Sequence, residues 1–289
     1  MLHAIYRSTG KVNSKARPAG FSKRESLESF LAAWEAAGPV TGDLLFLNDG
    51  PVPEAQLELM QASGRVVVRA VADAMGAYVA ALDLALEQAW PDGDLIYFGE
   101  DDYLYRSDTF AALAAAAEAL PQADHFAPYA TIGHTMPNGE PLHEGLRRPR
   151  LRGEALATVD GVTWHRATSH TVSYAIRVGA LRADRPLHLL ALRAGGAWDH
   201  AFCLACQGRQ PFTARELLDP LPGGGPAARR AKVMLWRLAM SAVALRRRVS
   251  GAHVIAAPRP ALASHMEVGL TAAGTDWAAA PGTLGYSSA

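Results

Sequence analysis

Cysteine is nearly absent from this chain. Its 289 residues include only Cys203 and Cys206, too few for a disulfide framework, so we expect a reducing, cytoplasmic setting. Long apolar runs are absent as well, since none approaches the roughly 20 residues needed to cross a bilayer. The apolar run at residues 2–6 meets Arg7 at once and is far shorter than a secretory signal. We find no internal repeat.

The chain also lacks an excess of charge of either sign, because 28 Lys and Arg residues balance 28 Asp and Glu residues. Binding to a nucleic-acid backbone needs a surplus of basic residues, so no nucleic-acid partner is expected. With 49% hydrophobic and 19% charged residues, the composition is that of an ordinary globular protein. The length suits one large α/β domain or two small ones.

Four short apolar runs in the first hundred residues predict β-strands. They lie at residues 2–6, 43–47, 65–70 and 94–98. Helical spacing separates them, most clearly behind Ser22, which forms a capping-box pattern with Glu25. Strands that alternate with helices predict an α/β fold, with a mostly parallel sheet and helices on both faces. Ligands of such sheets bind beyond the carboxyl ends of the strands.

The second half of the sequence is less regular. Residues 171–178 look like a strand and residues 198–207 like a helix. A Pro- and Gly-rich break after residue 220 precedes a basic, apolar helical pattern at 227–249 and then a tail rich in Pro and Ala. We therefore divide the chain into a main domain, 1–220, and a C-terminal helical extension, 221–289.

Three consecutive acids follow the fourth predicted strand. Glu100, Asp101 and Asp102 crowd like charges at a strand end, which raises their proton affinity unless a cation neutralises them. Hard carboxylate oxygens suit Mg²⁺ or Mn²⁺, which share the rest of their ligand shell with substrate phosphates. The alternative is a solvated acidic turn that caps the following helix.

This strand end, together with the loops after the first two strands, resembles the GT-A class of glycosyltransferases and its family 2 in particular. In that class an Asp-x-Asp-type motif holds a divalent metal on the diphosphate of a nucleotide sugar. The resemblance implies metal ligands at Asp102 and Glu100, and a ribose or sugar contact at Asp101. Gly99 departs from the pattern, because it stands where the first Asp of the motif often is.

The resemblance also implies a nucleotide site in the loops. The first loop would bind the nucleotide and its diphosphate through Tyr6, Arg7, Ser8, Lys15 and Arg17. A planar Arg guanidinium can hold a diphosphate with two hydrogen bonds, although a solvated basic loop is the alternative for each cation. Asp49 matches a position that often binds the nucleoside, and Gly76 resembles a close-packed turn beneath the nucleotide, at a helix N-terminus.

GT-A enzymes that invert the sugar use an acidic residue at the start of a helix, after a Gly-containing loop, as general base. The segment 195–200 resembles that arrangement and implies that Asp199 deprotonates the acceptor, with His200 as the alternative base. Asp199 could instead only cap its helix. These enzymes often supply a further metal ligand from a His near the C-terminus. His265 resembles it, with His253 as the alternative.

The activity implied by the resemblance is metal-assisted transfer of a sugar from a nucleoside diphosphate sugar to a hydroxyl acceptor, with inversion and with Mn²⁺ or Mg²⁺ as cofactor. Residues 1–105 would form the nucleotide-binding half and residues 106–220 the acceptor half, and the C-terminal extension would close over the donor. Two alternatives stay open. One is a nucleotidyltransferase, which usually has a Gly-rich basic loop after its first strand, and the other is a non-catalytic nucleotide- or glycan-binding module.

Two further patterns need an interpretation. Cys203 and Cys206 have CxxC spacing, but they lie within a helical apolar pattern, which indicates buried structural cysteines. The segment 227–249 carries many cations and no acid, so it could lie on an anionic membrane surface, at the inner face of the membrane. We favour a core-packed helix with a basic solvent stripe, or a dimer contact, because the whole chain has no net charge.

Overall fold

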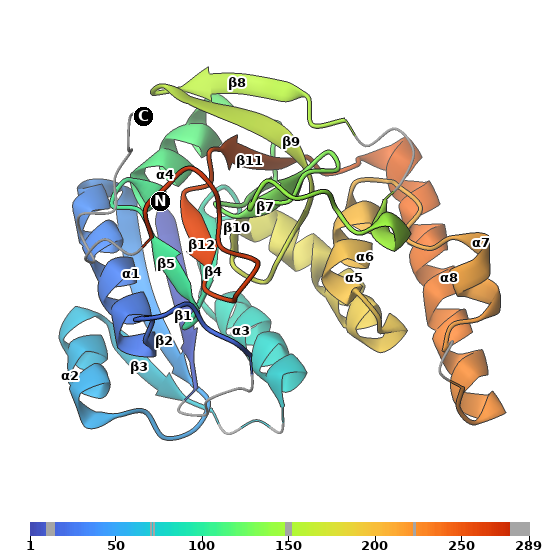
Figure 1. Ribbon diagram of the computed structural model, residues 1–289, viewed down its shortest axis with the longest axis horizontal. Helices are drawn as coiled ribbons and strands as arrows, with labels where there is room; N and C mark the ends of the chain where they lie inside the picture. Colours follow the sequence, from blue (N-terminus) through green and yellow to red (C-terminus); the bar gives the residue numbers. More distant parts are fainter. Residues whose placement is uncertain (10–14, 70, 72, 148–151, 222–223, 278–289) are drawn as a thin grey trace.

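The structure is a computed structural model, and it describes residues 1–9, 15–69, 71, 73–147, 152–221 and 224–277. Strands and helices alternate through the first hundred of these residues, as predicted (Figure 1). The elements of the first half are β1 (Leu2–Ser8), α1 (Lys23–Ala37), β2 (Thr41–Asn48), α2 (Glu54–Ser63), β3 (Arg65–Val68), α3 (Ala74–Glu87), β4 (Leu95–Glu100), β5 (Tyr103–Tyr105) and α4 (Thr109–Ala119).

The second half of the chain adds shorter strands and most of the remaining helices. The predicted helices at 198–207 and 227–249 are present within one residue of their expected ends, whereas the strand expected at 171–178 begins only at Tyr174. These elements are β6 (His125–Phe126), β7 (Ala130–Ile132), β8 (Ala155–Val159), β9 (Val162–His170), β10 (Tyr174–Arg177), α5 (Val178–Ala194), α6 (Trp198–Cys206), α7 (Ala214–Leu218), α8 (Ala227–Ser250), β11 (Ile255–Arg259) and β12 (Ala263–His265).

The large sheet confirms the predicted α/β class. Its parallel part has the strand order β3-β2-β1-β4, and β1 lies between β2 and β4, so that Arg7 is paired with Leu47 on one side and Glu100 on the other. Because these strands run the same way, their carboxyl ends meet at one edge of the sheet. The predicted strand ends at residues 7, 48 and 100 are therefore neighbours.

Antiparallel pairing extends the sheet beyond β4. β10 runs antiparallel to β4, and the order continues through β6, β11, β9 and β7, with β8 on β9. The strand β11, from the C-terminal extension, lies between β6 and β9. Strands as short as His125–Phe126 carry too few residues to show a two-residue period, so sequence periodicity does not reveal them.

Each face of the sheet carries its own apolar core. In β1, Ala4 and Tyr6 belong to the core beneath α1 and α4, whereas Ile5 belongs to the core beneath α3, α5 and α6. In β4, Tyr97 and Phe98 divide between the same two cores. Successive strand residues point to opposite faces, so near-continuous apolar strands are what a sheet covered on both sides requires.

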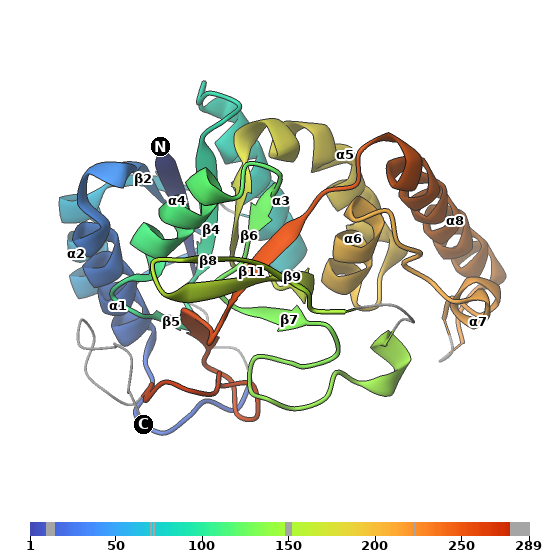
Figure 2. The ribbon, with the colours of Figure 1, turned by 90° about the horizontal axis from the view of Figure 1, so that it is seen from above.

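Helix α8 lies at the outer edge of the molecule in both views, packed on α5 and α6 (Figures 1 and 2). The helix is packed on the core, as expected, but its orientation corrects part of the expected basic solvent stripe. Arg237 is buried and donates to the carbonyl oxygens of Ala194 and Glu216, whereas Leu235 is 61% exposed. No helix in the described part of the chain is both long and apolar enough to span a bilayer.

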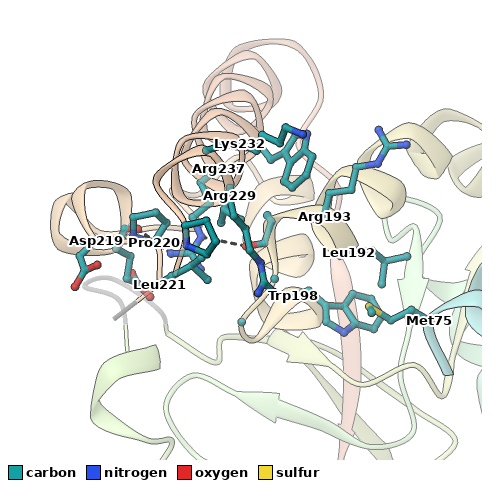
Figure 3. Close-up of a pocket in the computed structure, with 18 of the residues that line it drawn as sticks. Met75, Leu192, Arg193, Trp198, Asp219, Pro220, Leu221, Arg229, Lys232 and Arg237 are labelled. Atoms are coloured by element: carbon teal, nitrogen blue, oxygen red, sulfur yellow. Dashed lines mark hydrogen bonds between the residues drawn. The ribbon is translucent and has the colours of Figure 1, made fainter. Parts of the chain in front are cut away.

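A cavity of about 1060 Å³ lies between α8, α7 and the ends of α5 and α6, and we call it the helical cavity (Figure 3). Met75 and Trp198 form one end of it, and Asp219 and Leu221 lie toward the other. Its wall mixes apolar and aromatic groups with five basic side chains and two acidic ones: Arg193, Arg215, Arg229, Lys232, Arg237, Glu216 and Asp219.

Phe30 of α1 is the centre of an aromatic cluster that joins α1 to the sheet and to α4. Its ring centroid lies 4.8 Å from that of Tyr6, 5.4 Å from Tyr105 and 4.9 Å from Phe110. The side chain is fully buried, and edge-to-face contacts of this kind add to the free energy gained from burial.

We predict that Phe30→Ala lowers the free energy of unfolding by about 3–5 kcal/mol, because it empties the centre of this cluster. Chemical denaturation followed by circular dichroism measures the change. The control is Leu218→Ala, which truncates a side chain that is 78% exposed and should change stability by no more than about 0.5 kcal/mol. Equal effects of the two substitutions would contradict the packing described here.

Candidate functional site

A cavity of about 870 Å³ opens at the carboxyl ends of β1, β2 and β4, and we call it the strand-end cavity. It brings together residues from the first loop, the acidic strand end, the start of α6 and the segment after β12. The predicted site residues that line it are Arg7, Ser8, Lys15, Asp49, Glu100, Asp101, Asp102, Asp199 and His265. Residues separated by more than two hundred positions in the sequence therefore face one space.

Each of the three consecutive carboxylates has its own cationic partner. Glu100 forms an ion pair with Arg7 of the neighbouring strand. Burial raises the pKa of the Glu100 carboxyl, and repulsion from Asp102 adds to this, while Arg7 opposes the shift. The crowded charges expected from the sequence are thus balanced in large part by side-chain cations.

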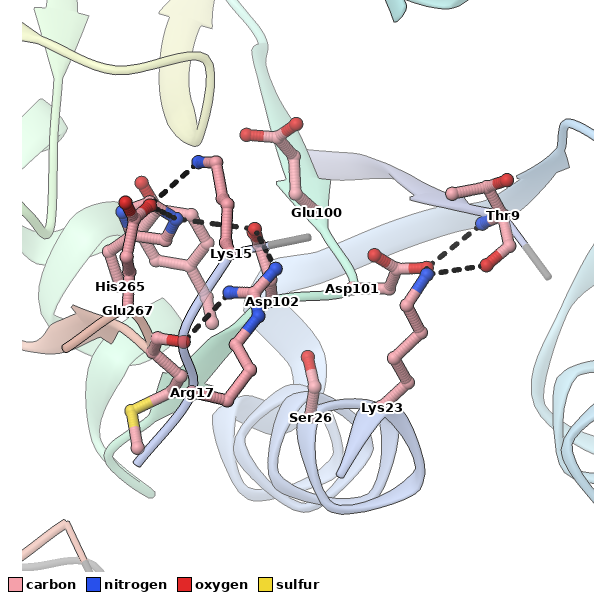
Figure 4. Close-up of polar contacts among 12 residues, drawn as sticks. Thr9, Lys15, Arg17, Lys23, Ser26, Glu100, Asp101, Asp102, His265 and Glu267 are labelled. Atoms are coloured by element: carbon pink, nitrogen blue, oxygen red, sulfur yellow. Dashed lines mark hydrogen bonds and ion pairs between the residues drawn. The ribbon is translucent and has the colours of Figure 1, made fainter. Parts of the chain in front are cut away.

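Asp101 ties the loop after β1 to the first turn of α1. Its carboxylate accepts hydrogen bonds from the Ser8 hydroxyl at 3.2 Å, from the Thr9 backbone N–H at 2.9 Å and from the Lys23 ammonium at 2.9 Å (Figure 4). The ammonium of Lys23 also donates to the Thr9 carbonyl oxygen at 2.6 Å. The sequence predicts that Asp101 contacts ribose or sugar, and this stays a prediction. In the structure its hydrogen bonds hold the start of the first loop against α1.

Lys23 is a site residue that the sequence prediction did not include. It opens α1, where the helix dipole disfavours a cation. Ser22 already caps the helix by accepting a backbone N–H, so a lysine directly after it has no capping role. Its unfavourable position therefore indicates a nearby acidic partner. The partner itself lies 78 residues away, so only the fold identifies it.

Asp102 points away from Asp101, toward Arg17 and His265 (Figure 4). Its Oδ2 atom accepts from the Arg17 guanidinium at 3.0 Å and lies 3.2 Å from His265 Nε2. Burial favours the neutral acid, but His265 and Arg17 outweigh it and lower the pKa of Asp102 to about 2. The Oδ1 atom is buried and has no hydrogen-bond partner.

The segment after β12 completes this side of the cavity. β12 pairs with β5 so that His265 lies opposite Tyr103, and the two rings stack with centroids 4.9 Å apart. Met266 donates its backbone N–H to the Asp102 carbonyl oxygen, and Glu267 forms an ion pair with Lys15 at 2.7 Å. The C-terminal extension therefore borders the acidic strand end, although its division from residues 1–220 stays a prediction.

Gly99 has a steric explanation. A Cβ atom at this position would lie 3.3 Å from the Tyr105 hydroxyl, from a ring carbon of Tyr6 and from a ring carbon of Tyr97. Alternation along β4 directs position 99 into the aromatic core rather than into the cavity. An aspartate there would bury its carboxylate among tyrosines, so the acidic motif of this chain starts one position later.

The strand end holds carboxylates and an imidazole, the group types that a divalent cation uses, although among the described residues only His125, Asp184 and His253 form a compact set of three ligand atoms. The Asp102 Oδ1 atom is buried without a partner, and His265 Nε2 lies beside the same carboxylate and 3.7 Å from a carboxylate oxygen of Glu267. Oxygen ligands with one imidazole are suitable for Mn²⁺ or Mg²⁺. Glu100, also predicted as a ligand, lines the same cavity and is paired with Arg7, and its ligand role stays a prediction.

A second group of candidate metal ligands lies away from the strand end. Among the described residues, His125, Asp184 and His253 place ligand atoms within 4.8 Å of one another. Arg247 pairs with Asp184 and contacts His253 Nε2 at 2.6 Å. Because a guanidinium only donates, His253 Nε2 must accept, and His253 Nδ1 lies 2.9 Å from a carboxylate oxygen of Asp184. The group is thus charge-balanced by Arg247, and His253 belongs to it rather than to the strand-end cavity.

Asp199 lies at the start of α6, as predicted, and faces the strand-end cavity. It is half-buried, and burial raises the pKa of its carboxyl group. The carboxylate accepts the backbone N–H of His200 at 2.8 Å, although the helix N-cap is Ala197. The side chain of His200 is buried and contacts the Leu146 carbonyl oxygen, outside the residues that line the cavity.

Three predicted residues lie behind the cavity surface. Tyr6 is fully buried, with its hydroxyl 3.0 Å from that of Ser26. Arg17 does not line the cavity, but its guanidinium pairs with Asp102 and donates to the Met266 carbonyl oxygen. Gly76 donates its N–H to the Asp73 cap of α3, and a Cβ there would meet neighbours only at ordinary distances, so close packing does not demand glycine.

Cys203 and Cys206 are buried without a disulfide, and burial raises both pKa values, which confirms their structural interpretation.

No protein-family model and no curated protein sequence matches this chain. Several solved structures are similar at low identity. S. aureus TarS 1-349, in complex with UDP, is 15% identical with a TM-score of 0.41 over 71% of this chain and 54% of that one. This chain therefore spans about half the length of that protein.

Two other solved structures cover more of the chain. A CMP:2-keto-3-deoxy-manno-octonic acid synthetase complexed with CTP is 11% identical, with a TM-score of 0.38 over 89% of this chain and 88% of that one. A nucleotidyl transferase from Methanothermobacter is 15% identical, with a TM-score of 0.37 over 85% and 98%. At these scores the similarities carry no functional argument, so function must be argued from the site.

We predict that Asp101 and Lys23 are energetically coupled, because they join β4 to α1 across the first loop. In a double-mutant cycle of Asp101→Asn and Lys23→Met, the coupling energy should be roughly 1 kcal/mol or more, above the level of exposed ion pairs. Urea denaturation of the four proteins measures it. Additive effects of the two substitutions would show that this contact does not hold the loop.

Proposed function

We propose that this protein is a metal-assisted glycosyltransferase that uses a nucleoside diphosphate sugar. One observation carries the proposal: a single cavity at the carboxyl ends of parallel strands combines a cation-binding set, basic side chains and a carboxylate with a raised pKa. Open sheets of this kind bind ligands at that edge, and titratable groups with shifted pKa values concentrate at functional sites.

The donor would lie along the first loop. Arg7 lines the cavity beside Ser8, and Lys15 lines it beside Glu267, so both could meet a diphosphate, and Asp49 is proposed to bind the nucleoside. Asp102 and His265 would hold a divalent metal, which neutralises charge on the diphosphate leaving group. Asp101 and Lys23 fix the loop that presents these groups.

The acceptor would enter from the helical cavity. The two cavities share Met75 and Trp198 in their walls, and Asp199 is the residue after Trp198. An acceptor hydroxyl at this junction would be within reach of the Asp199 carboxylate on one side and of the donor on the other. The five basic against two acidic side chains of the helical cavity favour an acceptor with negative charge.

The products distinguish this proposal from the two alternatives. Glycosyl transfer releases a nucleoside diphosphate, nucleotidyl transfer releases pyrophosphate, and a binding module releases neither. A nucleotidyltransferase would need a Gly-rich basic loop after its first strand, and this chain has only a weak match to such a loop there. Two residues of that match, Gly10 and Lys11, lie outside the described residues. The raised pKa of Asp199 supports transfer to a hydroxyl, because a base that ionises closer to neutral pH removes a proton more effectively.

We expect a nucleoside diphosphate sugar to raise the melting temperature of the protein, and Mn²⁺ to increase that shift. A thermal-shift panel of such donors, with and without Mn²⁺, measures both effects. Asp102→Asn should remove the metal-dependent part, because it weakens the carboxylate that faces the cation, while the folded state persists. His134→Ala, which changes a histidine away from the cavity, is the control. Donor affinity insensitive to Asp102→Asn and to a chelator would refute the metal role.

We predict that Asp199→Asn leaves donor affinity near that of the wild type and lowers turnover at least about a hundredfold, the usual scale of general-base loss. The wild-type rate should fall as the pH drops through the raised pKa of Asp199, and the variant should lose that limb of the profile. His200→Ala is the neighbouring control and should retain the pH dependence. A fully active Asp199→Asn would mean that Asp199 serves only the helix start.

A further inference from the structure

Helix α8 presents an apolar stripe to solvent. Its inner face packs on α5 and α6 through buried residues that include Val233, Met240 and Ala244. The outer face carries large apolar side chains at successive intervals of three, seven and four residues, so they lie along one side of the helix. They are Leu235, Leu238, Leu245 and Val249, exposed by 61%, 45%, 55% and 89%.

The charges of α8 all have the same sign. The helix has no acidic residue, and four of its basic side chains are exposed: Arg246 and Arg248 near the end of the stripe, and Arg229 and Lys232, which also line the helical cavity. Three others are used inside the protein, since Arg230 pairs with Asp219, Arg247 pairs with Asp184, and Arg237 is buried. The outer surface of α8 is therefore both apolar and cationic.

We infer that α8 binds the surface of an anionic lipid bilayer, lying in the plane of the headgroups with its leucine and valine stripe inserted. A helix with an apolar face and flanking Lys and Arg residues binds such surfaces through burial and through attraction to anionic lipids. Its position at the outer edge of the molecule leaves this face accessible (Figures 1 and 2).

A second copy of the chain is the main competing occupant, because a stripe at this spacing can also pack against another helix. Pairing two α8 helices would bring two sets of exposed cations together without one acid to offset them. Like-charge contact of this kind opposes association. An anionic bilayer buries the apolar stripe and attracts the cations. Because the whole chain has no net charge, the electrostatic attraction to the bilayer is confined to α8.

Co-sedimentation with vesicles tests the inference. The wild-type protein should pellet with vesicles of equal parts phosphatidylcholine and phosphatidylglycerol, and much less with pure phosphatidylcholine. Binding should decrease as salt screens the cations. Leu235→Glu should weaken binding roughly tenfold, because it replaces an inserted side chain with an anion. Val68→Glu is the matched control, since Val68 is 72% exposed on β3, at the opposite edge of the sheet, and this change should leave binding intact.

Three results would overturn the inference: no pelleting of the wild type with anionic vesicles, equal pelleting with neutral vesicles, or equal loss in both variants. Size-exclusion chromatography with light scattering tests the competitor. A wild-type dimer that Leu235→Glu converts to a monomer would assign the stripe to a second copy instead. Circular dichroism of both variants confirms that each is folded. No nucleotide or sugar enters these measurements, so their outcome is independent of the proposed transfer reaction.

Discussion

The Asp101 carboxylate is the contact on which the strand-end cavity depends. It lies at the end of β4 and joins the end of β1, the residue after it and the first turn of α1 through three hydrogen bonds. A buried carboxylate needs such partners, because its ionised form is costly away from water. The same three contacts fix where the first loop starts, while the parallel pairing of β1 with β4 places Arg7 opposite Glu100. The start of the first loop is thus tied to the satisfaction of one buried charge.

The other two acids, Glu100 and Asp102, also pair with cations, and these come from distant parts of the chain. Glu100 is paired with β1 through Arg7, and Asp102 is paired with the first loop through Arg17 and with the C-terminal extension through His265. Three like charges in succession can coexist because each is directed to a different cation. The negative charges of the three carboxylates are already largely balanced by these cations. A metal cation could bind in addition at the Asp102 Oδ1 atom, which has no hydrogen-bond partner.

The sequence predicts the parallel half of the fold well, because strands covered on both faces show as apolar runs and helices show as spaced apolar residues. The rule that ligands bind at the strand ends then locates the cavity around residues 7, 49 and 100. Partners such as Lys23 and Glu267 do not follow from the sequence, since their roles depend on contacts across 78 residues or more. The predicted orientation of α8 is wrong at Arg237 for a different reason. This side chain is buried and donates to backbone carbonyl groups, which residue type alone does not indicate.

Arg237 also connects α8 to the predicted base. Its guanidinium donates to the Ala194 carbonyl oxygen at the last residue of α5, where a cation is favoured by the helix dipole. The chain then turns through Gly195 and Gly196, both at positive φ, a conformation that glycine adopts without strain, and α6 begins two residues later with Trp198 and Asp199. The helix that we propose to lie on the bilayer therefore contacts the end of α5 just before the turn that leads to Asp199, so the proposed membrane surface and the strand-end cavity are connected through one buried side chain.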